Sequence, residues 1–166
     1  MNIFEAITIL KEQVPNPTEG LPEELFRYVS SVTPMVNVDL LIKDEKGRVL
    51  LSWRDDQYTG KGWHIPGGII RFKETITSRI KIVAEQELGV EVSFDPKPIA
   101  IEQIIIPEKE IRGHFISLLI RCKLPSSFVP GNKGLSRNDP GYLKWHEICP
   151  DDLLKYHEIY RKYING

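Results

Sequence analysis

The chain has few cysteines, no excess of charge of either sign and no long apolar run. Its 166 residues include only Cys122 and Cys149, whose separation matches no metal-binding spacing, so we expect two reduced thiols. The 22 basic and 23 acidic residues leave no electrostatic footprint for nucleic acid or an anionic membrane. With no secretory signal or membrane-spanning run either, we expect a cytoplasmic protein that binds neither partner.

What the sequence does contain is a succession of helical and strand-like segments. Residues 1–33 are expected to form an N-terminal helical segment that is interrupted between Pro15 and Pro22, and residues 34–166 a single domain that ends in a helix. Strands flanked by helices predict a mixed sheet covered on both faces. The expected strands are 36–43, 48–54, 62–66, 98–106, 114–124 and 143–145, and the expected later helices are about 75–88 and from Pro150 onwards.

Residues 67–90, GGIIRFKETITSRIKIVAEQELGV, carry the most informative pattern. Glu74 lies six residues after Gly68, and Glu87 and Gly89 follow at fixed spacing. This pattern resembles the Nudix box, G-x5-E-x7-R-E-U-x-E-E-x-G-U, in which U is a bulky aliphatic residue. The resemblance implies an α/β/α sandwich with a mixed β-sheet, in which a helix follows the glycine turn and ends at Gly89.

The helix positions that carry carboxylates in the Nudix box are occupied here by Val83, Gln86 and Glu87. Residues at this spacing share one helix face, and oxygen atoms there suit the octahedral ligation of Mg²⁺. The resemblance implies a site for Mg²⁺, with Mn²⁺ as an alternative, at the Gly68 carbonyl and Glu87, assisted by Gln86. Because Glu87 is the one carboxylate left, we expect the metal to bind together with the diphosphate of the substrate.

Two members of the box have a structural alternative to metal binding. Glu74 lies at the expected start of the helix, where a carboxylate is stabilised by the helix dipole and free N–H groups. Glu87 could instead be a solvated helix carboxylate. Both alternatives stay open at the level of the sequence.

Residues 33–68 are similar to the corresponding stretch of the GDP-mannose mannosyl hydrolases, a Nudix subgroup with fewer box carboxylates. In that subgroup water attacks the anomeric carbon of the sugar and releases a nucleoside diphosphate. The resemblance implies that Asp39 and Arg54 lie near the substrate. Arg54 also has a chemical rationale, because a guanidinium stabilises charge that develops on a leaving diphosphate.

Three further residues are candidates for catalysis or binding. His64 comes just before the glycine turn and could activate water, and Asp139 in the loop before Tyr142 could be a base or a ligand. Phe115, where the subgroup has a tyrosine, could contact the substrate by stacking. A buried structural imidazole, a turn carboxylate and core packing are the respective alternatives.

These observations predict a Mg²⁺-dependent hydrolase of a nucleoside diphosphate linked to another moiety, with a nucleotide sugar as the preferred substrate. Two alternatives stay open: cleavage of a phosphoanhydride, and a non-catalytic nucleotide-binding module on a Nudix scaffold. Because the mannosyl hydrolases are homodimers, the resemblance also implies a dimer, in which we expect the N-terminal segment to pack against the partner.

Overall fold

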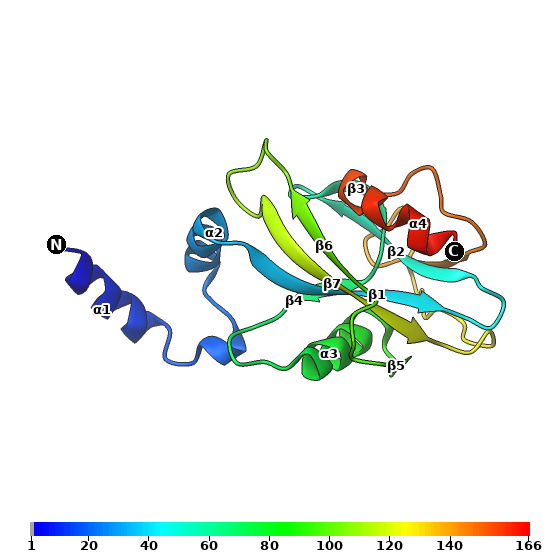
Figure 1. The fold of residues 1–166 in the computed structure, drawn as a ribbon, viewed down its shortest axis with the longest axis horizontal. Helices are drawn as coiled ribbons and strands as arrows, with labels where there is room; N and C mark the ends of the chain where they lie inside the picture. Colours follow the sequence, from blue (N-terminus) through cyan, green and yellow to red (C-terminus); the bar gives the residue numbers. More distant parts are fainter. Residues whose placement is uncertain (1) are drawn as a thin grey trace.

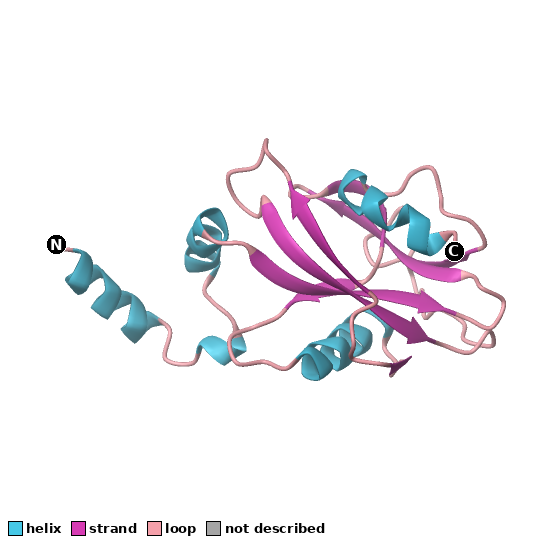
Figure 2. Ribbon diagram, viewed as in Figure 1, coloured by secondary structure: helices cyan, strands magenta, loops and turns pink. Residues whose placement is uncertain are grey.

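The computed structural model describes residues 2–166, and Met1, which begins the predicted N-terminal segment, lies outside them. The chain forms an α/β/α sandwich around a mixed sheet, with helices before, within and after the strands (Figure 1). Figure 2 shows the strands gathered in the centre and the helices at their periphery. The predicted fold class is confirmed.

The helical elements agree with the expected order. The helices are α1 (Ile3–Gln13), η1 (Pro17–Glu19), α2 (Glu23–Val32), α3 (Ile76–Leu88), η2 (Lys155–Tyr160) and α4 (Arg161–Ile164).

The sheet is built around a parallel pair of strands, β1 and β7, whereas all its other strand pairs are antiparallel. The main path runs in the order β3-β2-β1-β7-β5, while β4 pairs with β1, β6 with β7 and β8 with β2. The strands are β1 (Met35–Lys43), β2 (Val49–Asp56), β3 (Gly60–His64), β4 (Gly67–Ile69), β5 (Ser93–Phe94), β6 (Ala100–Ile105), β7 (His114–Lys123) and β8 (Leu143–His146).

Two separate cores follow from the alternation of side chains along β1. Val38, Leu40 and Ile42 lie on one face of the sheet. They pack there with Ile80, Val83 and Ala84 of α3. Leu41 packs with Tyr160 and Ile164 of the C-terminal segment on the other face. In Figure 1, α3 and α4 accordingly lie on opposite sides of the sheet.

Helix α3 begins and ends where the box pattern predicts. The Thr75 side chain caps its start by accepting a hydrogen bond from the Ser78 N–H, and Gly89 ends it in the left-handed conformation with φ of 70°. Glycine adopts this conformation without the steric cost that a β-carbon would add.

The C-terminal segment departs from the prediction. The helix expected from Pro150 begins only at Lys155, and its first part is a 3₁₀ helix. Leu153 forms a parallel bridge with Trp63, and the N–H of Leu154 donates to the Trp63 carbonyl oxygen. These backbone groups are therefore used by the sheet and cannot start a helix. The short strands β4 and β5 were also not expected, because their glycine and polar residues lack a strand pattern.

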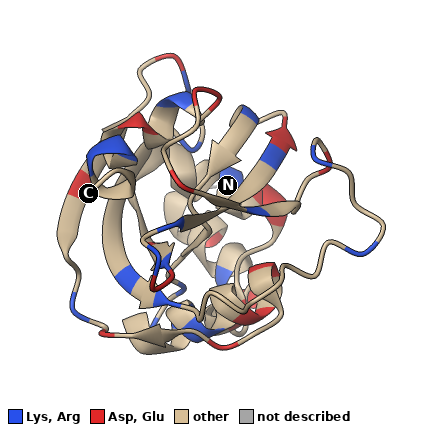
Figure 3. Cartoon of the chain, turned by 90° about the vertical axis from the view of Figure 1, so that its right-hand side faces the viewer, with Lys and Arg blue, Asp and Glu red and all other residues tan. Residues whose placement is uncertain are grey.

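Helix α1 extends away from the rest of the chain (Figure 1), and it has no buried residue. Basic and acidic residues are interspersed along the chain, as Figure 3 shows. Both cysteines are free, as expected, and both are buried. Within residues 2–166 no helix is long and apolar enough to cross a lipid bilayer.

Candidate active site

A cavity of about 200 Å³ lies beside the glycine turn, between β1, β2, β7 and the C-terminal segment. Of the residues predicted to bind substrate or act in catalysis, Asp39, Arg54, His64 and Phe115 line it, together with Gly68. The structure therefore brings together residues from four distant parts of the sequence. Four further lining residues follow from no pattern in the sequence: Asn37, Arg112, Tyr156 and His157.

Asp39 lies at the bottom of this cavity and is only 3% exposed. Its Oδ2 accepts hydrogen bonds from the hydroxyl groups of Ser117 and Tyr160. Burial raises the pKa of Asp39, and these two hydrogen bonds oppose the rise. The carboxylate is thus held in one orientation by β7 and the C-terminal segment.

The glycine turn is in close contact with this carboxylate. A β-carbon on Gly67 would lie 2.2 Å from Oδ1 of Asp39 and 2.7 Å from the Val38 carbonyl oxygen. A β-carbon on Gly68 would lie 2.8 Å from Cγ2 of Val83. Glycine is therefore required at both positions, and the side chain of Val83 packs directly against the turn.

His64 and Glu87 form a partly buried pair beside the turn. Nδ1 of His64 lies 2.8 Å from the Ser52 carbonyl oxygen, and because a carbonyl only accepts, this nitrogen carries a proton. Nε2 then points towards Oε2 of Glu87 at 3.8 Å. The other oxygen of Glu87 accepts a hydrogen bond of 3.2 Å from the Gly67 N–H. Nε2 of His64 is the ring nitrogen that is available to accept a proton.

Arg54 and Arg112 place two positive charges in the cavity. Nε of Arg54 lies 3.5 Å from Asp56, whereas Arg112 has no ion pair within residues 2–166. The guanidinium of Arg112 lies 5.6 Å from the ring centre of Phe26 and 5.3 Å from that of Tyr58. Burial and the charge of Arg54 lower the pKa of Arg112.

Arg112 also has an unusual backbone conformation, with φ of 55°. Such a conformation costs a residue with a side chain about 1–3 kcal/mol, and it is found most often at functional sites. The contacts with the rings of Phe26 and Tyr58 hold the guanidinium in place. The charged loop at residues 107–113 was visible in the sequence, but nothing there indicated that it returns to the end of β2.

His157 is the second histidine of the cavity. Its ring lies 5.8 Å from that of His64, and its Nδ1 accepts a hydrogen bond of 3.2 Å from the Ile65 N–H. Burial, reinforced by the nearby His64 and Arg54, lowers the pKa of His157 well below its usual value. His157 is therefore neutral at neutral pH and orients the backbone that precedes the glycine turn.

The remaining predicted residues lie outside the cavity lining. Glu74 accepts hydrogen bonds from Arg79 and from the Arg71 N–H, at 2.8 and 2.9 Å, so its role in this structure is a structural one. The partners are a side chain of α3 and a backbone group that precedes it, rather than the free N–H groups of the helix start. Gln86 is exposed on α3. Asp139 is part of a turn, and its carboxylate accepts a hydrogen bond of 2.6 Å from the Ser136 N–H.

The donor atoms around the turn do not form a metal site by themselves. Glu87 is the one carboxylate on this face of α3, and the side chain of Val83 packs against Gly68 where the box has a second carboxylate. Residues 2–166 contain no group of three or more His, Cys, Asp and Glu side chains placed to hold a metal ion. The predicted ligands Gly68, Gln86 and Glu87 thus fall short of the six oxygen ligands that Mg²⁺ prefers.

The sequence of the chain is similar to that of a known protein over part of its length. No protein-family model matches the chain. The chain is 34% identical over 87 residues to the low-salt glycan biosynthesis protein Agl8 of Haloferax volcanii, a match that covers 52% of this chain and 55% of that relative. The chain thus spans about half the length of this curated relative.

Among solved structures, a MutT protein from Methanosarcina mazei superposes with a TM-score of 0.61 at 18% identity, over 81% of this chain and 95% of that one. A MutT Nudix hydrolase from Burkholderia pseudomallei gives a TM-score of 0.60 at 19% identity, over 78% of this chain and 97% of that one. The fold predicted from the box is therefore confirmed: this chain has the fold of the Nudix hydrolases.

Proposed function

We propose that the chain hydrolyses a nucleoside diphosphate linked to another moiety, with a nucleotide sugar as the preferred substrate. The observation that carries this proposal is the pair Arg54 and Arg112, which meet in one cavity next to the glycine turn. Two partly buried guanidinium groups repel one another, and a diphosphate between them would relieve the repulsion and accept several charge-assisted hydrogen bonds.

The size of the cavity limits how the substrate binds. Cavities that enclose a whole drug-sized ligand measure about 300–1,000 Å³, whereas this one measures about 200 Å³. It would enclose the diphosphate and the atoms next to it. The rest of the substrate would then lie on the rim, where Tyr58 stacks with Arg112.

In the proposed reaction His64 activates the water molecule. The water oxygen bonds to the anomeric carbon of the sugar and its proton passes to Nε2 of His64, while the bond from that carbon to the diphosphate oxygen breaks. The electron pair leaves with the diphosphate, whose charge is stabilised by Arg54 and Arg112. Glu87 faces the imidazolium that forms, as its distance of 3.8 Å from Nε2 of His64 allows.

We expect a divalent cation to bind to the protein together with the substrate. Mg²⁺ or Mn²⁺ bound to the diphosphate would be held by the Glu87 carboxylate and the Gly68 carbonyl oxygen. Gln86, on the same helix as Glu87, would assist. The cation would supply neutralisation of the phosphate charge. We expect the apparent affinity for the cation to be measurable only when a nucleoside diphosphate is present.

The bond that breaks can be identified with isotope-labelled water. Attack at the sugar carbon leaves all phosphate oxygens in place, so hydrolysis in ¹⁸O-labelled water should put the label in the sugar. Label in the phosphate would instead establish cleavage of the phosphoanhydride, the alternative reaction.

A second candidate function is binding of a nucleotide without turnover. It is favoured by Val83, which packs against the turn where the Nudix box has a carboxylate. A screen of nucleotide sugars and dinucleotides, with and without Mg²⁺, separates the two by combining thermal stability with product release. An enzyme releases a nucleoside diphosphate, whereas a binding module is stabilised by the same compounds and leaves them intact.

A further inference from the structure

A second cavity, of about 600 Å³, lies on the sheet face that also carries the candidate active site. Leu41 and Lys43 of β1 line it, whereas Asn37 and Asp39 of the same strand line the candidate active site. Because alternate residues of a strand share one face, both cavities open on the same face, one towards each end of the strand. The two cavities have no lining residue in common.

The parallel pairing of β1 with β7 gathers positive charge in this second cavity. Leu41 pairs with Arg121, and Lys43 with Lys123, so that all four side chains lie on one face. Within residues 2–166, Lys43, Arg121 and Lys123 take part in no ion pair, although all three line the cavity. Burial, reinforced by the charge of Arg121, lowers the pKa of the Lys43 ammonium group.

The acidic residues beside the cavity are already bonded to other groups. Asp44 forms an ion pair of 2.7 Å with Arg48, and Glu45 accepts a hydrogen bond of 2.7 Å from the Ser126 N–H. The N–H donor leaves the negative charge of Glu45 in place, but within residues 2–166 neither carboxylate forms an ion pair with the three cations. The cations therefore outnumber the one carboxylate beside them that has no ion pair.

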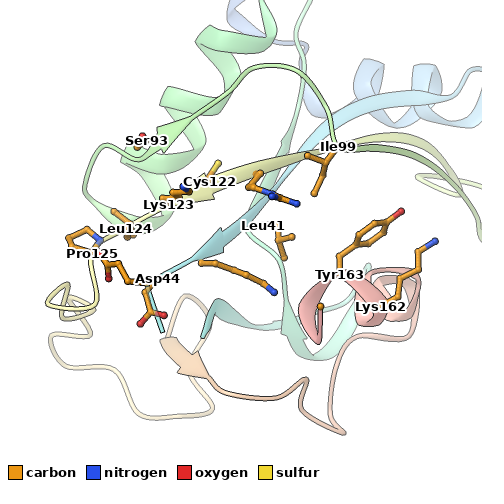
Figure 4. A pocket seen from close by; sticks show the side chains of 14 residues that line it. Leu41, Asp44, Ser93, Ile99, Cys122, Lys123, Leu124, Pro125, Lys162 and Tyr163 are labelled. Carbon is orange, nitrogen blue, oxygen red and sulfur yellow. The ribbon is translucent and has the colours of Figure 1, made fainter. Parts of the chain in front are cut away.

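The opposite wall is apolar and aromatic. Figure 4 shows the ring of Tyr163, from the C-terminal segment, beside Leu41 of β1. The ammonium group of Lys162 points away from the cavity in the same view and pairs with Glu102 at 3.2 Å. A ligand here would meet cations on the side of the strands and an apolar surface on the side of Tyr163.

We propose that this cavity is a second ligand site, which binds a phosphate-bearing small molecule through Lys43, Arg121 and Lys123. Three cations in one cavity suit an anion with several charges, and the guanidinium of Arg121 can hold two phosphate oxygens at once. The volume falls within the range of about 300–1,000 Å³ that is typical of small-molecule sites. This proposal does not depend on the function of the candidate active site.

Isothermal titration with inorganic pyrophosphate, in buffer with EDTA, tests the proposal. We expect Arg121→Gln to bind one equivalent fewer than the wild type, or to bind that equivalent at least about 10-fold more weakly, the loss expected for a charge-assisted contact. Lys123→Gln should act in the same direction. Lys81→Gln, which removes an exposed charge on α3, serves as the matched control and should leave both sites intact.

The same titration separates this proposal from that of the candidate active site. The double variant Arg54→Gln, Arg112→Gln should lose the other equivalent and keep the one that depends on Arg121. If the candidate active site does not bind diphosphate, the wild type takes up a single equivalent, and Arg121→Gln abolishes it. Equal stoichiometry and affinity in the wild type, Arg121→Gln and Lys123→Gln would overturn the proposal.

Discussion

Glu87 is the residue on which the proposed chemistry depends most. It faces Nε2 of His64 at 3.8 Å, and it is the carboxylate that a substrate-bound cation would meet. Glu87→Gln should therefore lower kcat by at least about 100-fold, the lower range for removal of a group that stabilises charge in the transition state. Steady-state kinetics on the substrate found in the screen provides the measurement.

The matched control is Glu85→Gln on the same helix. Glu85 is exposed, and two residues along a helix separate it from Glu87 by about 200° around the axis. Its replacement should leave kcat within about 2-fold, since isolated surface charges contribute little. Wild-type turnover in Glu87→Gln would remove this carboxylate from the mechanism.

The partly buried His146 predicts a dependence of stability on pH. Burial lowers its pKa to about 4 from its usual 6.5, so between these values the unfolded chain binds a proton that the folded chain does not. The free energy of unfolding should thus fall as the pH falls from 6.5 to 4, with a slope of at most about 1.4 kcal/mol per pH unit from this residue.

His146→Gln should reduce this acid-induced loss, as measured by denaturant unfolding at a series of pH values. The exposed Lys133→Gln in the loop before β8 is the control, because Lys133 is not among the charges that shift the pKa of His146 and its replacement should leave the slope unchanged. An identical slope in His146→Gln and the wild type would show that His146 does not titrate differently in the two states.

At the residue scale, the sequence indicated the members of the site that belong to a local pattern. Gly68 and Glu87 follow from the spacing of the box, and Asp39 and Arg54 from a resemblance. Arg112 and His157 follow no local pattern, because a loop and the C-terminal segment bring them to the cavity only in the folded chain. Tyr160 likewise bonds to Asp39 from 121 positions away.

Among the elements, the short strand β4, which begins with Gly67 and Gly68 and pairs with β1, is the one in closest contact with the site. Gly67→Ala would place a β-carbon 2.2 Å from Asp39 and 2.7 Å from the backbone of β1. We expect a loss of about 1–3 kcal/mol in the free energy of unfolding, which is typical of overpacking in a core. Urea unfolding followed by circular dichroism gives this quantity.

Gly131→Ala is the control for this change, because no atom lies within 4 Å of a β-carbon added there. It should change the free energy of unfolding by no more than about 0.5 kcal/mol, as surface substitutions usually do. Equal stability of the two variants would contradict the close approach of Gly67 to Asp39.

At the element scale, periodic and capped segments were predictable, whereas pairing was not. The box helix was predicted with its terminal glycine at Gly89, and the structure adds an N-terminal cap at Thr75. The extended stretch around Leu153 has the composition of a helix, and only its contact with Trp63 keeps it in the sheet. Whether this stretch is helical or extended depends on tertiary packing, which the sequence of one segment does not reveal.

At the scale of the whole molecule, α1 is the feature that a single chain leaves unexplained. Ile3 and Phe4 are 81% and 77% exposed, and Ile7 and Leu10 on the same helix are 45% and 40% exposed. A helix this short is marginal unless its apolar side is covered. We therefore propose a symmetric dimer in which this helix packs against the partner.

Light scattering on the full chain and on a chain that lacks residues 2–20 tests the dimer. We expect twice the mass of one chain for the first and the mass of one chain for the second. Catalytic turnover per site should survive the deletion, since no residue of α1 lines the candidate active site. A full-length chain that is monomeric at micromolar concentration would end this proposal.

The hydrolase function is tested most sharply by kcat/KM for release of nucleoside diphosphate from a nucleotide sugar, measured for the wild type, Arg112→Gln and Arg137→Gln. Arg112 is proposed to bind the leaving diphosphate, whereas Arg137 is 62% exposed and lies in the loop after β7. We expect a loss of at least about 10-fold for Arg112→Gln, as for other charge-assisted contacts, and no change for Arg137→Gln. Turnover by Arg112→Gln equal to that of the wild type would contradict the proposed role of Arg112 in binding the leaving diphosphate.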